Sequence, residues 1–145
     1  RQGEDLYLVT FKWNVLTSSL ASNKWLSEIV HDNPLWMNPE TARELGIHKD
    51  DVVKVSSPVG AIETKVRLTQ GIHPKVVAMS GQVGHWGMGR VARAEKFVSQ
   101  DPDTRLVWWK AHGNGSHPNT VMMHEASPLT GAPGWHDNRV KVARV

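Results

Sequence analysis

The chain contains no cysteine among its 145 residues. This absence excludes disulfide bonds, thiolate metal sites, iron–sulfur ligation and a cysteine nucleophile, and it leaves the redox compartment undetermined. Long apolar runs are also missing, since no stretch approaches the roughly 20 residues that a membrane-spanning helix needs. We therefore expect no direct insertion into a membrane.

Charge of one sign is never concentrated in this sequence. The formal net charge is +3, and lysines and arginines are interspersed with acids instead of forming a basic run. A nucleic-acid groove usually needs clustered basic residues, so we expect no nucleic-acid partner. With 39% hydrophobic and 21% charged residues, residues 1–145 are expected to form a single globular domain. Because the chain begins at Arg1, we expect a processed protein or a piece of a larger one.

The aromatic residues are unevenly distributed between types, with one tyrosine and two phenylalanines against seven tryptophans. One tryptophan lies in the segment SGQVGHWGMGR, residues 80–90, where four glycines surround His85 and Trp86. Glycine permits positive φ and a close approach to the main chain, while His and Trp can stack or form hydrogen bonds. The segment predicts a shelf for a flat ligand, and a plain flexible loop is the alternative.

The alternation of apolar residues predicts a mainly β protein. We expect strands at residues 5–13, 34–38, 51–57, 61–68, 74–81, 120–125 and 138–145. A short helix capped by Ser22 would bury Trp25, Leu26, Ile29 and Val30, and a second helix would start with Asn38 as cap and Pro39 and end at Gly46. Short strands with two or three short helices and long loops indicate a closed or partly closed barrel.

Polar side chains follow the first predicted strand. Lys12, Asn14, Thr17, Ser18 and Ser19 lie between that strand and the start of a helix, where small polar groups can hold a phosphate. A polar turn with a cap explains them equally well, and no GxxxxGK[ST] motif is present.

Asn38 offers a similar choice between roles. Its amide can cap a helix or read the edge of a purine.

Patterns for self-contained catalysis are absent from the sequence. Five of the eight histidines lie in the loop-rich second half, yet no HExxH motif or tight pair indicates a metal site. Ser127 and Thr130 lie near His124 without a G-x-S-x-G turn, so we expect no nucleophilic residue. No residue is therefore predicted to be catalytic or to bind a metal.

Four segments together resemble a known family. They are LVTFKWNVLTSS (8–19), MNPETARELGIHKDDVVKVSSPVGAIETKVRLTQGIHPKVV (37–77), the Gly/His/Trp loop, and PNT with SPLTGAPGWHDNRVKV. The chain resembles the C-terminal dinucleotide-binding domain of molybdopterin oxidoreductases of the dimethyl-sulfoxide-reductase family. The resemblance implies a six-stranded double-psi β-barrel that binds one molybdopterin guanine dinucleotide. The Gly/His/Trp loop resembles the branch acting on polysulfide or on oxyanions of sulfur or arsenic.

The resemblance also implies which residues contact the cofactor. They are Lys12, Trp13, Asn14, Leu16 and Thr17 on the pterin and phosphate side, Asn38 at the guanine end, His85, Trp86 and Gly87 at the pterin, and Asn119, Trp135 and His136 closing over it.

The expected partners are an iron–sulfur electron-transfer subunit together with the remaining domains of the same catalytic subunit. Molybdenum or tungsten would be carried by the complete enzyme, and any iron–sulfur cluster would belong to the missing part. The resemblance favours a periplasmic over a cytoplasmic location, which the sequence itself leaves open. The 145 residues alone are not expected to be active.

Two other functions are compatible with the residues alone. A non-enzymatic β-barrel could use exposed tryptophans and basic residues to bind a peptide or single-stranded nucleic acid, although stacking platforms of that kind interleave aromatics with Lys and Arg. A self-contained hydrolase is the other.

Overall fold

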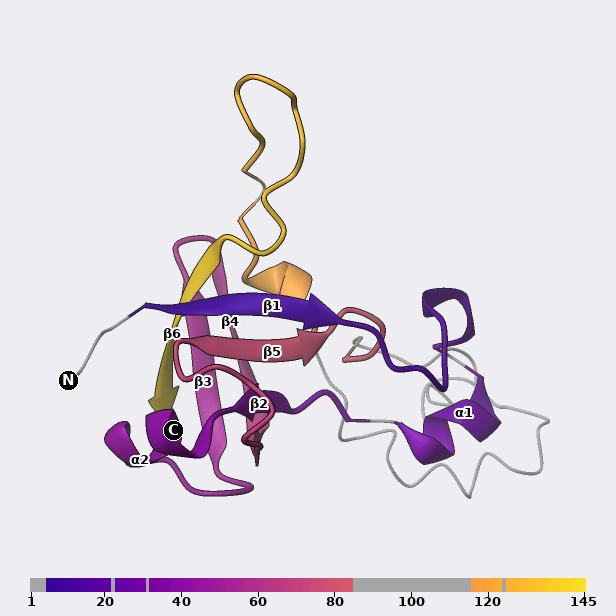
Figure 1. The fold of residues 1–145 in the computed structure, drawn as a ribbon. Helices are drawn as coiled ribbons and strands as arrows, with labels where there is room; N and C mark the ends of the chain where they lie inside the picture. The colour runs from indigo at the N-terminus through magenta and orange to yellow at the C-terminus, as the bar shows by residue number, and fades with distance from the viewer. Residues whose placement is uncertain (1–4, 22, 31, 85–115, 124) are drawn as a thin grey trace.

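Six strands form a closed barrel in the computed structural model, which describes residues 5–21, 23–30, 32–84, 116–123 and 125–145. The strands are β1 (Leu6–Phe11), β2 (Leu35–Met37), β3 (Val52–Ser57), β4 (Gly60–Leu68), β5 (Val76–Ser80) and β6 (Asn138–Arg144). Their order around the barrel is β1-β5-β2-β4-β3-β6, and β6 pairs with β1 to close it (Figure 1). This is the double-psi β-barrel that the resemblance implied.

The barrel mixes parallel and antiparallel neighbours. β1 runs parallel to β5, with Phe11 opposite Ser80, and β2 runs parallel to β4. β2 and β5 are antiparallel, so Met37 at the end of β2 lies opposite Val77 near the start of β5. The exits of β1 and β5 are therefore at one end of the barrel, and the exit of β2 is at the other.

The interior is filled by the apolar members of each alternating strand. Val53 and Val55 of β3 are fully buried, as are Leu35 and Met37 of β2, and Val140 of β6 is nearly so. Polar and charged residues occupy most of the alternate, outward positions of β3 and β4, with Val52 and Ala61 as the exposed exceptions. The period-two pattern in the sequence thus identifies the core-facing side chains correctly.

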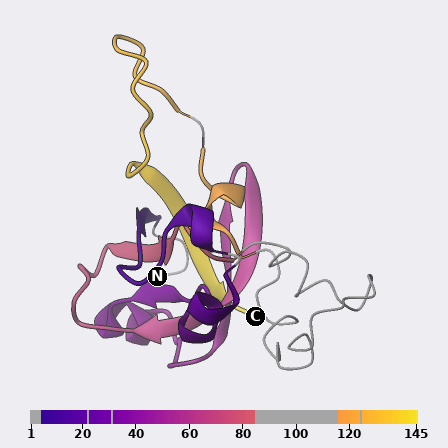
Figure 2. The same ribbon diagram turned by 90° about the vertical axis from the view of Figure 1, so that its right-hand side faces the viewer.

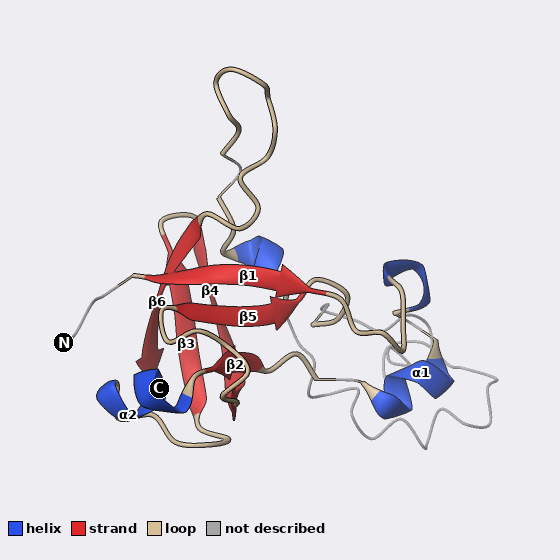
Figure 3. Cartoon of the chain, in the orientation of Figure 1, coloured by secondary structure: helices blue, strands red, loops and turns tan. Residues whose placement is uncertain are grey.

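Helix α2 (Pro39–Glu44) begins and ends as the sequence predicts. The Asn38 side chain accepts a hydrogen bond of 2.8 Å from the main-chain N–H of Glu40, and Pro39 occupies the first turn. Gly46 follows the helix with φ of +67°, a conformation that side chains other than glycine rarely adopt. Figure 3 shows this helix below the barrel, at the end opposite the exit of β1.

Helix α1 (Lys24–Ile29) differs from its prediction in two respects. Ser22 lies outside the described residues, and the cap is Asn23, whose side chain accepts from the N–H groups of Trp25 and Leu26. Trp25 and Ile29 are 66% and 65% exposed, so the helix does not bury its predicted face. Six residues form fewer than two turns. The described part of the chain covers the apolar side chains of this short helix only in part.

The predicted strand over residues 120–125 is wrong. Pro118–Thr120 form a 3₁₀ turn, η4, and the N–H groups of Val121 and Met122 donate to the carbonyl of Pro118. Val121 and Met122 are nevertheless buried in the core. The apolar residues thus predicted burial correctly, but Pro118 starts a helical turn because its φ suits one.

Between η4 and β6 a long arm stands away from the barrel, as Figures 1 and 2 show from two directions. Two main-chain hydrogen bonds between Ser127 and residues 131 and 132 shape it, together with an isolated bridge between Ala126 and Pro133. Leu129 near its tip is 93% exposed. Among the described residues no helix is both long and apolar enough to cross a membrane.

Candidate functional site

The polar loop that follows β1 is held by the side chain of Gln82. Gln82 comes two residues after β5, and its Oε1 accepts from the main-chain N–H of Trp13. Its Nε2 donates to the carbonyl of Leu16 at 2.6 Å. The turn at Asn14 and Val15 therefore lies between two anchored main-chain groups, and the buried Leu16 side chain fixes it further.

The polar side chains of this loop can donate hydrogen bonds and are exposed. Lys12, Asn14, Thr17, Ser18 and Ser19 all face solvent, and residues 12–21 contain no carboxylate. The hydroxyls of Thr17 and Ser19 share a hydrogen bond of 3.0 Å. A cation, an amide and three hydroxyls without an opposing acid suit a phosphate-bearing group. The loop therefore fits the phosphate part of the expected cofactor.

Trp13 belongs to an aromatic cluster on the outer face of the barrel. Its ring lies 5.3 Å from Phe11 and 5.5 Å from Trp36, both in edge-to-face geometry. The guanidinium of Arg67 lies 4.8 Å from the centre of the Trp36 ring. The indole N–H groups of Trp13 and Trp36 are buried without a hydrogen-bond partner among the described residues. The cluster anchors one end of the polar loop through packing.

Gly84 does not serve the role that the sequence predicts for the glycines of residues 81–89. It is buried with φ of +88°, and a Cβ placed on it would lie 2.6 Å from the carbonyl oxygen of Ser116 and 2.9 Å from Nδ2 of Asn33. The absence of a side chain at Gly84 therefore makes room for the main chain of Ser116 and not for a ligand. Gly81 differs, since its nearest neighbour at the Cβ position is Thr10 at 3.9 Å, an ordinary contact distance.

Asn33 is the centre of that close approach. It is 2% exposed, and its Nδ2 donates to the carbonyls of Ser80, Val83 and Ser116 while its Oδ1 accepts from the N–H of Ser80. Its own carbonyl accepts from the hydroxyl of Thr64. The Asn33 amide thus joins the exit of β5 to the segment before η4, and the Asn33 main chain adds a bond to strand β4.

Asn119 lies at the same end of the barrel as the polar loop. It is exposed in η4, and its N–H donates to Nδ1 of His117. Nε2 of His117 lies 3.4 Å from the carbonyl of Gly81, directly beside the residue that holds the loop. The structure thus brings the predicted Asn119 close to the exit of β5.

Trp135 and His136 are exposed at the base of the arm. Asn138, which is 2% exposed, donates to the carbonyls of Gly134 and Trp135 and accepts from the N–H of Met123 at 2.6 Å. Both legs of the arm are therefore fixed to the first residue of β6.

Asn38 is separated from these loops. It follows Met37 at the other end of β5, about 16 Å along the sheet from Gly81, since it is level with Val76 and each strand residue advances about 3.3 Å. Its amide caps α2 and also donates to the carbonyl of Ile72 at 2.7 Å. A structural role accounts for this buried side chain.

The predicted residues His85, Trp86 and Gly87 lie outside the described residues.

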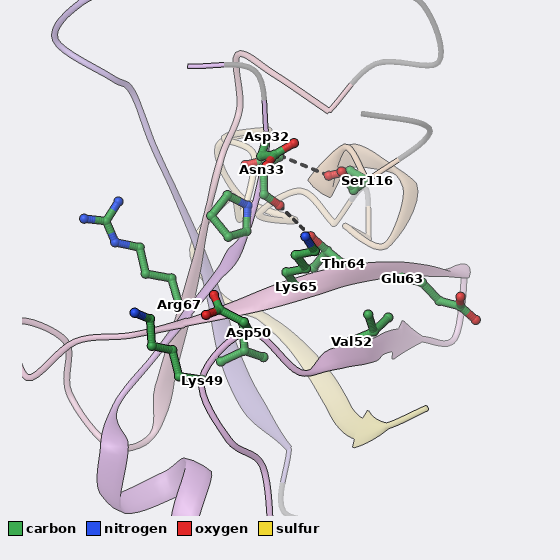
Figure 4. A pocket seen from close by; sticks show the side chains of 12 residues that line it. Asp32, Asn33, Lys49, Asp50, Val52, Glu63, Thr64, Lys65, Arg67 and Ser116 are labelled. Carbon is green, nitrogen blue, oxygen red and sulfur yellow. Dashed lines mark hydrogen bonds between the residues drawn. The ribbon is translucent and has the colours of Figure 1, made fainter. Parts of the chain in front are cut away.

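A pocket of about 610 Å³ opens on the outer face of β4 (Figure 4), away from the predicted residues. Three acids and three cations line it, so its charges balance and do not favour a polyanionic ligand. The charged residues are Asp32, Lys49, Asp50, Glu63, Lys65 and Arg67.

Three buried amides were not predicted from the sequence: Asn33, Gln82 and Asn138. No local pattern distinguishes them from other Asn and Gln residues, because each has at least one partner that lies 15 to 83 residues away along the chain. Their one common signal is position, since each lies next to the end of a strand that borders a long loop.

The sequence of this chain matches known proteins over most of the barrel. The model of the family described as "Molydopterin dinucleotide binding domain" matches residues 6–139. ArrA of Chrysiogenes arsenatis, the molybdopterin-containing subunit of an arsenate respiratory reductase, is 32% identical over 105 residues, which cover 72% of this chain and 11% of that protein. A tetrathionate reductase chain of Salmonella typhimurium is 31% identical over 101 residues, covering 70% and 10%.

The fold has a counterpart among solved structures. Acetylene hydratase from Pelobacter acetylenicus superposes with a TM-score of 0.69 at 14% identity, over 97% of this chain and 18% of that one. This chain spans about a tenth of the length of the arsenate and tetrathionate reductase chains described above. The family match covers nearly the whole barrel and agrees with its six strands and its donor loop. This chain therefore belongs to the molydopterin dinucleotide binding domains of the dimethyl-sulfoxide-reductase family.

Proposed function

We propose that this chain binds one molybdopterin guanine dinucleotide as part of the catalytic subunit of a molybdenum or tungsten oxidoreductase. The observation that carries the proposal is the exposed, acid-free donor loop at the exit of β1, in a chain whose family binds such dinucleotides. A phosphate-tethered cofactor needs donors that are already oriented and not neutralised by carboxylates.

The residues divide the work of binding. Lys12 supplies a positive charge for the phosphates, and Asn14 and Thr17 supply neutral donors. Trp13 and Leu16 hold the loop through packing. Asn119 adds a further polar side chain for the cofactor at the same end of the barrel. Asn38 is left out of this contact set because its amide already caps α2 and tethers Ile72.

The bound metal centre supplies the oxidation–reduction chemistry, and the protein supplies binding and orientation. The relatives are named as reductases of arsenate and tetrathionate. We therefore propose that the complete enzyme acts on an oxyanion of sulfur or arsenic, or on polysulfide. Its proposed partners are an iron–sulfur electron-transfer subunit together with the other domains of the same catalytic subunit.

Cofactor analysis of the parent enzyme tests this function. The enzyme is purified and denatured, and its molybdenum, tungsten, pterin and nucleotide base are measured per polypeptide. We expect one of the two metals together with pterin and guanine. A parent enzyme that contains no pterin contradicts the proposal, and a base other than guanine contradicts its finer part. Reduction of arsenate, tetrathionate, thiosulfate and polysulfide is then assayed with an artificial electron donor.

A further inference from the structure

We propose that Gln82 is a positioning residue for the cofactor, acting through the loop of residues 12–17. The inference rests on the proposed function, because it concerns how that loop is held ready for its ligand. Gln82 itself makes no proposed contact with the cofactor.

Burial and bonding both single out this side chain. Gln82 is 1% exposed, and its N–H donates to the hydroxyl oxygen of Ser80 at 3.1 Å. Its amide then reaches across to Trp13 and Leu16, which lie 69 and 66 residues earlier in the chain. A glutamine that is fully removed from water and uses both ends of its amide is held in one orientation.

The position of Gln82 explains what the amide does. The ladder between β1 and β5 runs on through a bond of 3.1 Å from the N–H of Gly81 to the carbonyl of Phe11. Beyond that point the main chains no longer pair with each other. The Gln82 side chain bonds instead to the main chain of Trp13 and Leu16, on either side of the turn. Lys12 and Thr17 flank this anchored segment, so their positions depend on it.

Removing the amide affects the loop before it affects the barrel. The carbonyl of Leu16 would lose its donor and the N–H of Trp13 its acceptor, and unpaired main-chain groups re-orient toward water. The turn would then take several positions, and the donors would have to be ordered when the cofactor binds. We therefore expect weaker cofactor retention from a side chain that does not touch the cofactor.

The first experiment compares two substitutions in the parent enzyme. Gln82→Met keeps the size of the side chain and removes both hydrogen bonds. Thr41→Val is the matched control, since the Thr41 hydroxyl is a buried donor to the carbonyl of Pro74 at the opposite end of the barrel. Pterin and metal content after dialysis, together with thermal unfolding, are measured for both. We expect Gln82→Met to lose the cofactor about tenfold faster than wild type, the factor for 1.4 kcal/mol, while Thr41→Val retains it.

A second variant separates positioning from mere stability. In Gln82→Glu a protonated carboxyl can still accept from Trp13 and donate to Leu16, whereas the ionised carboxylate cannot donate. Burial raises the pKa of such a carboxyl. The hydrogen-bond partners of Gln82 in the described chain, Trp13, Leu16 and Ser80, carry no titratable side chain. The ionisable groups that border them are the Lys12 amine, next to Trp13, and the His117 imidazole, whose Nε2 lies 3.4 Å from the carbonyl of Gly81. Both are present in wild type, so the pH profile of wild type is the reference for the variant. Gln82→Glu should therefore retain the cofactor at about pH 6 and release it at about pH 9, with wild type unchanged over that range.

The outcomes distinguish this inference from the proposed function. If the wild-type enzyme carries no pterin, the proposed function fails. If wild type carries it and Gln82→Met retains it equally, the positioning role is wrong. Equal cofactor loss in Gln82→Met and Thr41→Val, or release from Gln82→Glu that does not depend on pH, also overturns it, because general destabilisation then explains the result.

Discussion

The carbonyl oxygen of Ser116 lies 2.6 Å from the point where a Cβ atom would stand on Gly84. The two residues belong to separate segments that Asn33 joins through hydrogen bonds to the carbonyls of Val83 and Ser116. Real Cβ atoms do not approach main chain this closely, so the contact requires glycine. The packing of η4 against the exit of β5 therefore depends on one missing side chain.

Gly84→Ala should destabilise the chain by about 2–4 kcal/mol. The cost of placing alanine in a left-handed conformation adds to the cost of its close contact with the main chain. Urea denaturation measures the change. Gly131→Ala is the control: it shares a positive φ of +70° but has no atom within 4 Å of the Cβ position, so it should cost only about 1–2 kcal/mol. Equal losses would show that the contact with Ser116 is unimportant.

Lys12→Gln should weaken cofactor binding by about threefold to tenfold, because a charged donor to phosphate is replaced by a neutral one. The wild-type affinity should also fall as ionic strength rises, and the fall should be smaller in the variant. Binding is measured by re-loading the cofactor-free parent enzyme.

Lys54→Gln provides the comparison for charge, since Lys54 is exposed on β3 away from the loop. It should bind as wild type does. Equal losses from both lysines would indicate a general effect of net charge.

Asp51→Asn should change how stability depends on pH. The main-chain N–H of His48 donates to Asp51 at 2.9 Å and, with Arg144 at 3.3 Å, lowers the pKa of this carboxyl below its usual 3.8. The folded state then holds its proton less tightly than the unfolded state. Wild type should be more stable than Asp51→Asn near neutrality, and the difference should shrink as the pH falls below about 4.

Acid titration of the unfolding free energy checks this prediction. Lys54→Gln again serves as control, because it leaves the carboxyl and both of its partners in place. A difference between wild type and Asp51→Asn that stays constant from neutral to acidic pH would contradict the assignment of the lowered pKa to these contacts.

Asn138→Ala should free the base of the arm. It leaves the N–H of Met123 and the carbonyls of Gly134 and Trp135 without their partner, at a cost of about 1–3 kcal/mol. Limited proteolysis should show faster cleavage within residues 125–136, measured by mass spectrometry.

Asn119→Ala is the matched control, because the same type of side chain is exposed there and substitution should change stability by less than about 0.5 kcal/mol. Cleavage in residues 125–136 at the wild-type rate in Asn138→Ala would show that the amide does not hold the arm.

Local chemistry alone determined the best-predicted parts of this protein. Caps, proline geometry and alternation each act over a few residues. They account for the helix from Pro39 with its Asn38 cap, the turn at Gly46, and the antiparallel pair of strands β3 and β4. The donor loop at Lys12 was also recognisable, because its composition without acids is a local property. The family resemblance supplied the type of barrel and its six strands, which no local rule contains.

Only the tertiary structure decided which side chains hold the loops. Gln82, Asn33 and Asn138 are ordinary polar residues until folding buries them against main-chain groups that are distant in sequence. The role of Gly84 changed for the same reason, since Ser116 fills the space that the sequence assigned to a ligand. A hydrogen bond or a steric contact needs two partners in space, and the sequence records the position of each along the chain but not the distance between them.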